Sequence, residues 1–174
     1  MHNSVGVVVL ASHTLKKTGA ANALFSGTNS DTKLPKIHVC INNILYNGID
    51  DIAVVVNQEQ WEIGAGLSGY PVCIAVDNGL PDVQHMVETG IKVLPGYITG
   101  VIIIKHDNQP VLSDNFAKLE KFHHQAPQCA VLPGDKRQNG YAALFPIESY
   151  HSLSKGLMVN KPISRECAQL HAVK

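Results

Sequence analysis

The chain has 174 residues, of which 45% are apolar and 16% are charged, and this composition is typical of a globular protein rather than a disordered one. Its length favours a single domain over residues 1–174. Basic and acidic residues balance to a formal net charge of zero, so the charge favours neither nucleic acid nor a membrane surface as a partner. No apolar run is long enough to span a bilayer, and the N-terminus lacks a signal-peptide pattern. We therefore expect a cytoplasmic protein.

The predicted elements alternate along the chain. Continuous runs rich in β-branched residues predict buried strands over residues 6–12 and 51–57. Further strands are predicted over residues 70–78, 100–106, 128–133 and 141–146, and the strand at 100–106 is the most apolar. Apolar residues at helical spacing, together with proline, serine and glycine boundary signals, predict helices over residues 35–48, 58–67, 81–94 and 113–125. Strands that alternate with helices favour an α/β fold of the Rossmann-like, doubly wound kind, with a mostly parallel sheet and helices on both faces.

Several side chains have simple structural interpretations. The four cysteines (Cys40, Cys73, Cys129 and Cys167) lack close spacing and are expected to be buried, reduced thiols. Trp61 is expected to pack on the second helix, and the pair His123–His124 is expected to be exposed at a helix end, where the helix dipole favours it.

Ligands of doubly wound sheets bind beyond the carboxyl ends of the strands, near the switch point in strand order. We therefore expect the loops at residues 11–24 and 106–113 to matter most. The first of these loops carries two lysines and a glycine, directly after a buried strand, in the manner of a phosphate-binding loop.

Four segments of the sequence resemble MobA/MocA-like nucleotidyltransferases, a family that transfers a nucleotide from an NTP, often to the molybdenum cofactor. "LASHTLKKTGAANALFS" is similar to the family pattern L-A-A-G-x-S-x-R-M-G-x-x-K-A-L-L-P. "GIDDIAVVVN", "DNQPVLS" and "GYAALFP" are similar to three later family segments, in the same order. The resemblance implies an NTP-transferase domain that uses Mg²⁺ and CTP or GTP.

The resemblance also implies a set of nucleotide-binding positions. They are Leu10, Ala11, Ser12, His13, Lys17, Gly19, Asn22 and Asn78. The first loop departs from the family at three of them. His13 replaces a glycine that lets the backbone approach phosphate, and Lys17 replaces an arginine, so the charge remains without the bidentate fork. Asn22 replaces the phosphate-binding lysine, a role for which the neighbouring Lys16 would substitute.

The second loop is altered in the same way. The family aspartate that binds Mg²⁺ aligns with Asn108, while Asp107 lies one residue earlier. An amide oxygen is a poorer Mg²⁺ ligand than a carboxylate, so either Asp107 or Asn108 takes the metal position. A late acidic segment of the family, D-[IV]-D-T-P-E-D, has no counterpart here. Its loss removes a second carboxylate from the metal site.

Three functions remain open on these residues. The first is an active nucleotidyltransferase in which Lys16, Lys17 and Asp107 are catalytic, acting on a nucleotide and on molybdopterin or another phosphorylated acceptor. The second is an inactive, degenerate relative that binds a ligand or a protein partner. The third is a transition-metal site such as Zn²⁺ at His13, His106 and Asp107, because the strands that precede them are neighbours in a sheet of order 3-2-1-4.

Overall fold

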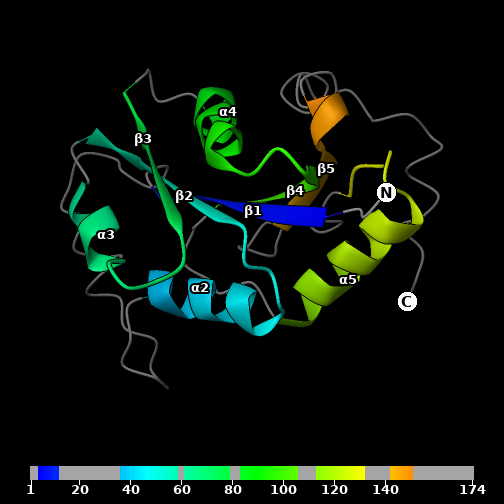
Figure 1. Cartoon of the computed structure of the whole chain (residues 1–174), viewed down its shortest axis with the longest axis horizontal. Helices are drawn as coiled ribbons and strands as arrows, with labels where there is room; N and C mark the ends of the chain where they lie inside the picture. The colour runs from blue at the N-terminus through cyan, green and yellow to red at the C-terminus, as the bar shows by residue number, and fades with distance from the viewer. Residues whose placement is uncertain are drawn as a thin grey trace.

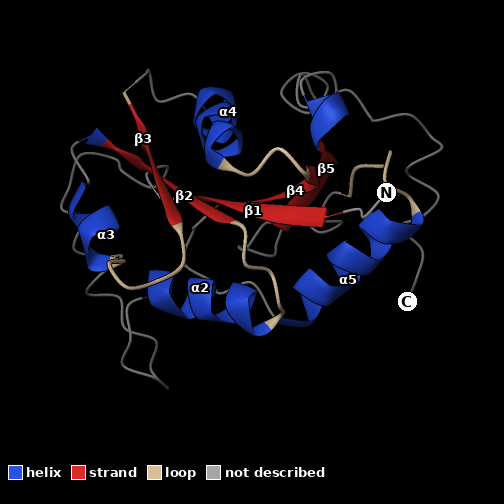
Figure 2. Ribbon diagram, in the orientation of Figure 1, coloured by secondary structure: helices blue, strands red, loops and turns tan. Residues whose placement is uncertain are grey.

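The computed structural model describes residues 4–11, 36–58, 61–78, 83–105, 113–131 and 142–150. A sheet of five strands forms the centre of this structure. The strand order is β3-β2-β1-β4-β5. The first four of these are mutually parallel and β5 runs antiparallel to β4 (Figure 2). The strands are β1 (Ser4–Leu10), β2 (Ile52–Asn57), β3 (Cys73–Asp77), β4 (Ile98–Lys105) and β5 (Ala142–Pro146).

Helices cover both faces of the sheet (Figure 1). On one face pack α2 (Lys36–Tyr46), α3 (Trp61–Gly66) and α5 (Ser113–Gln125). On the other face pack α4 (Val83–Val93) and the short 3₁₀ helix η2 (Ile147–Ser149). The predicted α/β class, with a doubly wound and mostly parallel sheet, is confirmed.

The two faces of the sheet form two separate cores because side chains alternate along each strand. In β1, Val7 and Val9 face the core under α2 and α5, whereas Val8 and Leu10 face the core under α4. These four side chains are at most 1% exposed. Burial on both faces explains why the strand is a continuous apolar run instead of an alternating pattern.

Most predicted elements match the structure within a few residues. The helix expected over 113–125 has those bounds, and the helix expected over 35–48 spans Lys36–Tyr46. The strand expected over 128–133 differs, because in its described part only Val131 pairs, through an isolated antiparallel bridge to Leu144. Residues 132 and 133 lie outside the described residues.

Three side-chain predictions are wrong, those for Trp61, His123 and Cys73, whereas His124 is exposed as predicted. Trp61 is 64% exposed, because it begins a helix of only six residues whose buried side chain is Ile63. His123 is fully buried: it follows Phe116 and Leu119 at spacings of seven and four residues, on the apolar stripe of α5. Cys73 is exposed on the edge strand β3.

The prediction that the cysteines are buried, reduced thiols is confirmed for Cys40. Cys40 and Cys73 are free thiols, and Cys129 is half-buried. Cys40 is buried, and burial raises the pKa of its thiol to about 12, so this cysteine is a packing residue without nucleophilic character at neutral pH. Cys167 lies outside the described residues. In the described ranges, no helix is long and apolar enough to cross a membrane.

His123, in the last turn of α5, contacts the amino ends of β4 and β1 through Thr99. The hydroxyl of Thr99 donates to the carbonyl of Ser4 at 3.2 Å, and Nε2 of His123 lies 2.9 Å from the same hydroxyl oxygen. Since the hydroxyl proton points to Ser4, the network assigns the proton of the ring to Nε2, which donates to Thr99. Nδ1 is buried and has no hydrogen-bond partner in the described residues. The ring is therefore held neutral.

Acid is expected to destabilise the fold through this histidine. Burial, and secondarily the charge of His124, lower the pKa of His123 below its usual value. A folded pKa below the unfolded one gives stability that is fully present above pH about 6.5 and is lost as the pH falls through the lower, folded pKa. Urea unfolding at pH 7.5 and pH 5 tests this for wild type and for His123→Gln. The acid-induced loss is expected to shrink in that variant and to persist in His124→Gln. An equal loss in all three proteins would contradict the assignment.

Candidate functional site

The carboxyl ends of the four parallel strands form one edge of the sheet. Leu10, at the end of β1, pairs in register with Lys105 at the end of β4. Asn57 at the end of β2 pairs with Asp77 at the end of β3. The chain enters the two predicted loops from this edge, after Ala11 and after Lys105.

Three of the predicted nucleotide-binding residues lie among the described residues, and all three lie at this edge. Leu10 and Ala11 are buried, and the amide of Ala11 donates to the carbonyl of Val55 at 2.9 Å. Their side chains are therefore part of the core. Asn78 is exposed and directly follows β3. The other predicted site residues lie outside the described residues, namely Ser12, His13, Lys16, Lys17, Gly19, Asn22, His106, Asp107 and Asn108.

The structure adds three polar residues that the sequence predictions missed. Asn57 and Asp77 end two neighbouring strands, and Asp77 is 6% exposed. Nε2 of His85, in the first turn of α4, lies 3.3 Å from Oδ1 of Asp77. A signal was present in the sequence: the apolar runs "IAVVVN" and "CIAVD" each end in a short polar residue, and strand ends of this kind carry ligand contacts in doubly wound sheets.

The chemistry of this edge favours a ligand that donates hydrogen bonds. Oδ1 of Asn57 is buried and has no hydrogen-bond partner within the described part of the chain. An unsatisfied buried acceptor costs about 1–3 kcal/mol, and a donor group of a bound ligand would remove that cost. Asp77 contacts the first turn of α4, where the helix dipole stabilises a negative charge.

The metal predictions depend on residues outside this part of the structure. Among the described residues, no group of three or more His, Cys, Asp or Glu side chains is placed to hold a metal ion. A Mg²⁺ site at this edge would therefore use Asp107 or Asn108, together with phosphate oxygens of a nucleotide.

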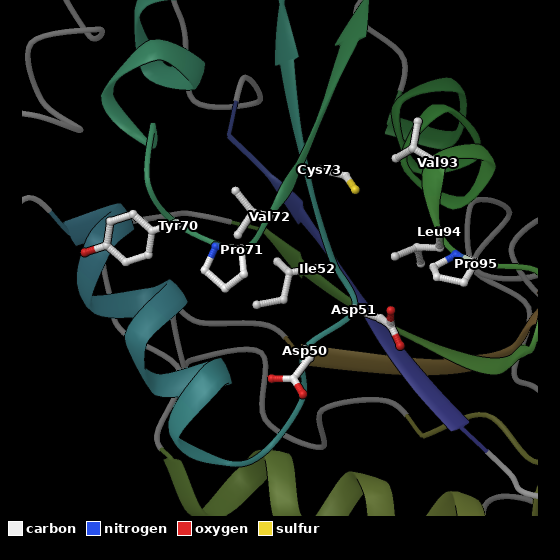
Figure 3. Close-up of a pocket in the computed structure, with 10 residues that line it drawn as sticks. All are labelled: Asp50, Asp51, Ile52, Tyr70, Pro71, Val72, Cys73, Val93, Leu94 and Pro95. Atoms are coloured by element: carbon white, nitrogen blue, oxygen red, sulfur yellow. The ribbon is translucent and has the colours of Figure 1, made fainter.

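A hollow lies at the opposite edge of the sheet, at the amino ends of β2 and β3 (Figure 3). Its volume is about 290 Å³, and its walls include Asp50, Asp51 and Cys73. The hydroxyl of Tyr97 donates to the carboxylate of Asp51 at 2.9 Å, and this hydrogen bond is the largest cause that raises the pKa of Tyr97. Because ligands of doubly wound sheets bind at the carboxyl ends, we place the candidate site at the other edge.

No family model and no curated protein matches this chain. Solved structures do match. Rv0371c of Mycobacterium tuberculosis H37Rv, in complex with manganese, has a TM-score of 0.68 at 10% identity, over 92% of this chain and 85% of that one. A 4-diphosphocytidyl-2C-methyl-D-erythritol synthase from Anaerococcus prevotii has a TM-score of 0.60 at 13% identity, over 97% and 82%. A nucleotidyl transferase from Methanothermobacter thermautotroptrophicus has 0.58 at 15%, over 86% and 74%. The chain therefore has a nucleotidyltransferase-like fold.

Proposed function

We propose that this protein binds a nucleoside triphosphate at the carboxyl edge of its sheet, with the phosphates at the loop after β1. The observation that carries the proposal is the placement of Asn57 and Asp77 at the ends of β2 and β3, beside the strand from which the lysine-bearing loop departs. The buried oxygen of Asn57, which has no hydrogen-bond partner among the described residues, would give the nucleoside part a specific acceptor. The nucleotidyltransferase-like fold supports the same placement.

Each site residue then has a role in nucleotide transfer. Lys16 and Lys17 would neutralise the triphosphate, and Gly19 would let the backbone approach it. Asp107, or Asn108 in its place, would hold Mg²⁺, which supplies charge neutralisation at the phosphates. In the transfer, an acceptor phosphate oxygen attacks the α-phosphorus in line and pyrophosphate leaves. CTP or GTP would be the donor, and molybdopterin or another small phosphorylated compound the acceptor.

Two other functions follow from the same edge. An inactive relative would bind a ligand or a protein partner without transferring a nucleotide. The substitutions at His13, Asn22 and Asn108 favour this alternative function. A Zn²⁺ site would use His13, His106 and Asp107. The pairing of β1 with β4 favours it, because the strand ends that precede these residues are neighbours.

Thermal unfolding with CTP, GTP and ATP, each with Mg²⁺ or with EDTA, distinguishes these functions. One nucleotide is expected to raise the melting temperature in a Mg²⁺-dependent way, because a ligand that binds only the folded state stabilises it by mass action. The double variant Lys16→Ala, Lys17→Ala is expected to lose the shift, while Lys92→Ala on α4 keeps it.

Other results of this experiment would favour one of the two alternative functions or overturn the proposal. A shift that persists in EDTA favours an inactive nucleotide-binding relative. A shift with Zn²⁺ alone, absent in His106→Ala, favours the metal site. No shift with any nucleotide would overturn the proposed function.

A further inference from the structure

We propose that the outer side of β3, which faces away from β2, pairs with the same strand of a second copy of this chain across a two-fold axis. The inference is independent of the proposed nucleotide site. β3 ends the sheet (Figure 1), and among the described residues its ladder partner is β2 alone. Backbone amides and carbonyls on the outer side of an edge strand pair readily with another strand.

The two edge strands of the sheet differ in how their outer sides are covered. In β5, Leu144 exchanges two backbone hydrogen bonds of 2.9 Å with Val131, on the side away from β4. In the part of the chain that the structure describes, no such bridge meets β3. Proteins often protect an open edge strand with a lysine, a proline or a bulge. β3 has the sequence CIAVD and pairs with β2 without a register shift, so the strand itself carries none of these three.

Apolar side chains lie next to this outer side. Ile74 and Val76 are 38% and 44% exposed, and they share one face of the strand because side chains alternate. That face packs on α3, since a Cβ at Gly64 would lie 3.0 Å from a methyl of Ile74. Trp61, which is 64% exposed, precedes Gly64 by three residues and therefore lies on the same side of α3. A second apolar strand that pairs with β3 would cover this patch.

The order of side chains in β3 favours a second copy over a strand of another protein. In an antiparallel pair centred on Ala75, Ile74 lies opposite Val76 of the second copy, and the two-fold axis repeats this match. Opposed β-branched side chains stabilise antiparallel pairs. Ala75 faces the core under α4, so both apolar pairs lie on the α3 face. The zero net charge of the chain also removes the long-range repulsion that keeps copies of a charged protein apart.

Sedimentation equilibrium of the full chain at increasing concentration tests the inference. Wild type is expected to approach the mass of two chains. Val76→Lys is expected to weaken self-association about tenfold or more, because a charge on an edge strand opposes strand pairing. The control Tyr46→Lys replaces an aromatic side chain that is 87% exposed at the end of α2, and it is expected to associate as wild type does.

A pair of double variants tests the register. Ile74→Lys and Val76→Glu are each expected to weaken the dimer, since each places a charge opposite an apolar side chain. The double variant Ile74→Lys, Val76→Glu places an ammonium opposite a carboxylate on both sides of the axis, and it is expected to dimerise again. The like-charged double variant Ile74→Lys, Val76→Lys is the matched control and is expected to stay monomeric.

Hydrogen exchange of the β3 amides distinguishes the other occupants of this strand. The outward-facing amides are expected to exchange faster when the chain is diluted to the monomer. Slow exchange in the monomer would show that another segment of this chain covers β3, and it would overturn the inference. A wild type that stays monomeric with fast-exchanging amides would leave β3 to a strand of another protein. That result would overturn the inference too, as would a dimer that persists in Val76→Lys.

Discussion

Replacement of Gly90 by valine is expected to destabilise the fold by about 3 kcal/mol or more, near the upper end of overpacking costs. Gly90 lies on the face of α4 that contacts the sheet. A Cβ at this position would lie 2.5 Å from Cγ1 of Val8 and 2.9 Å from Cγ2 of Val55. Both valines are fully buried on the central strands β1 and β2, so neither can move aside without disturbing the core.

Urea unfolding measures this effect, with Gly96→Val as the matched control. A Cβ at Gly96 meets nothing within 4 Å, so the control is expected to unfold at a midpoint near that of wild type. If Gly90→Val unfolds at the same midpoint as the control, then α4 does not pack on the sheet as described.

Gly100→Ala is expected to cost about 1–3 kcal/mol, for a different steric reason. A Cβ here would lie 2.7 Å from both Cε1 and Nε2 of His123. The neighbouring residue, Thr99, is skipped in the pairing of β1 with β4, since Ser4 pairs with Ile98 and Val5 with Gly100. Because of this irregularity, Thr99 contacts both Ser4 and His123. The absence of a side chain at Gly100 makes room for the imidazole ring of His123.

A double-mutant cycle identifies the imidazole as the cause. If the clash with the ring produces the loss, then Gly100→Ala should cost much less in a His123→Ala background than in wild type. Strictly additive losses in the double variant would contradict the proposed contact. Unfolding in urea at pH 7.5 keeps protonation of His123 out of the comparison.

The sheet could be predicted from the sequence because its strands are simple. Residues 52–56 are buried on both faces, so β2 is an uninterrupted apolar run, and alternation of strands with helices then implies parallel pairing. The order β3-β2-β1-β4 confirms the neighbouring ends of β1 and β4 on which the Zn²⁺ hypothesis depends.

Side-chain environments were harder to predict. His123 is polar, and its residue type alone assigns it to the surface, although its spacing from Phe116 and Leu119 places it on the buried face of α5. Its buried ring contacts Thr99, which is 24 positions away in sequence. Trp61 fails in the opposite direction, because α3 is too short to bury more than Ile63. In both cases the residue type alone predicts the wrong environment for the side chain.

The candidate site could be predicted as a location but not as a set of side chains. Strand ends indicated the carboxyl edge, and Leu10, Ala11 and Asn78 lie there. The contact between His85 and Asp77 joins a helix to a strand across the undescribed residues 79–82. No periodic pattern reports such a contact. The buried oxygen of Asn57, which has no hydrogen-bond partner among the described residues, is likewise a tertiary feature that the sequence does not show.

Mapping of a bound nucleotide by backbone amide NMR tests the central claim most directly. The spectrum of the labelled chain would be followed during titration with CTP–Mg²⁺ and then GTP–Mg²⁺. We predict that the amide signals of Ala11, Asn57 and Asn78, at the carboxyl edge, shift with saturation, while Asp51 and Cys73 at the opposite edge stay unchanged. Shifts confined to Asp51 and Cys73, or no shifts with either nucleotide, would contradict the claim that the carboxyl edge binds a nucleoside triphosphate.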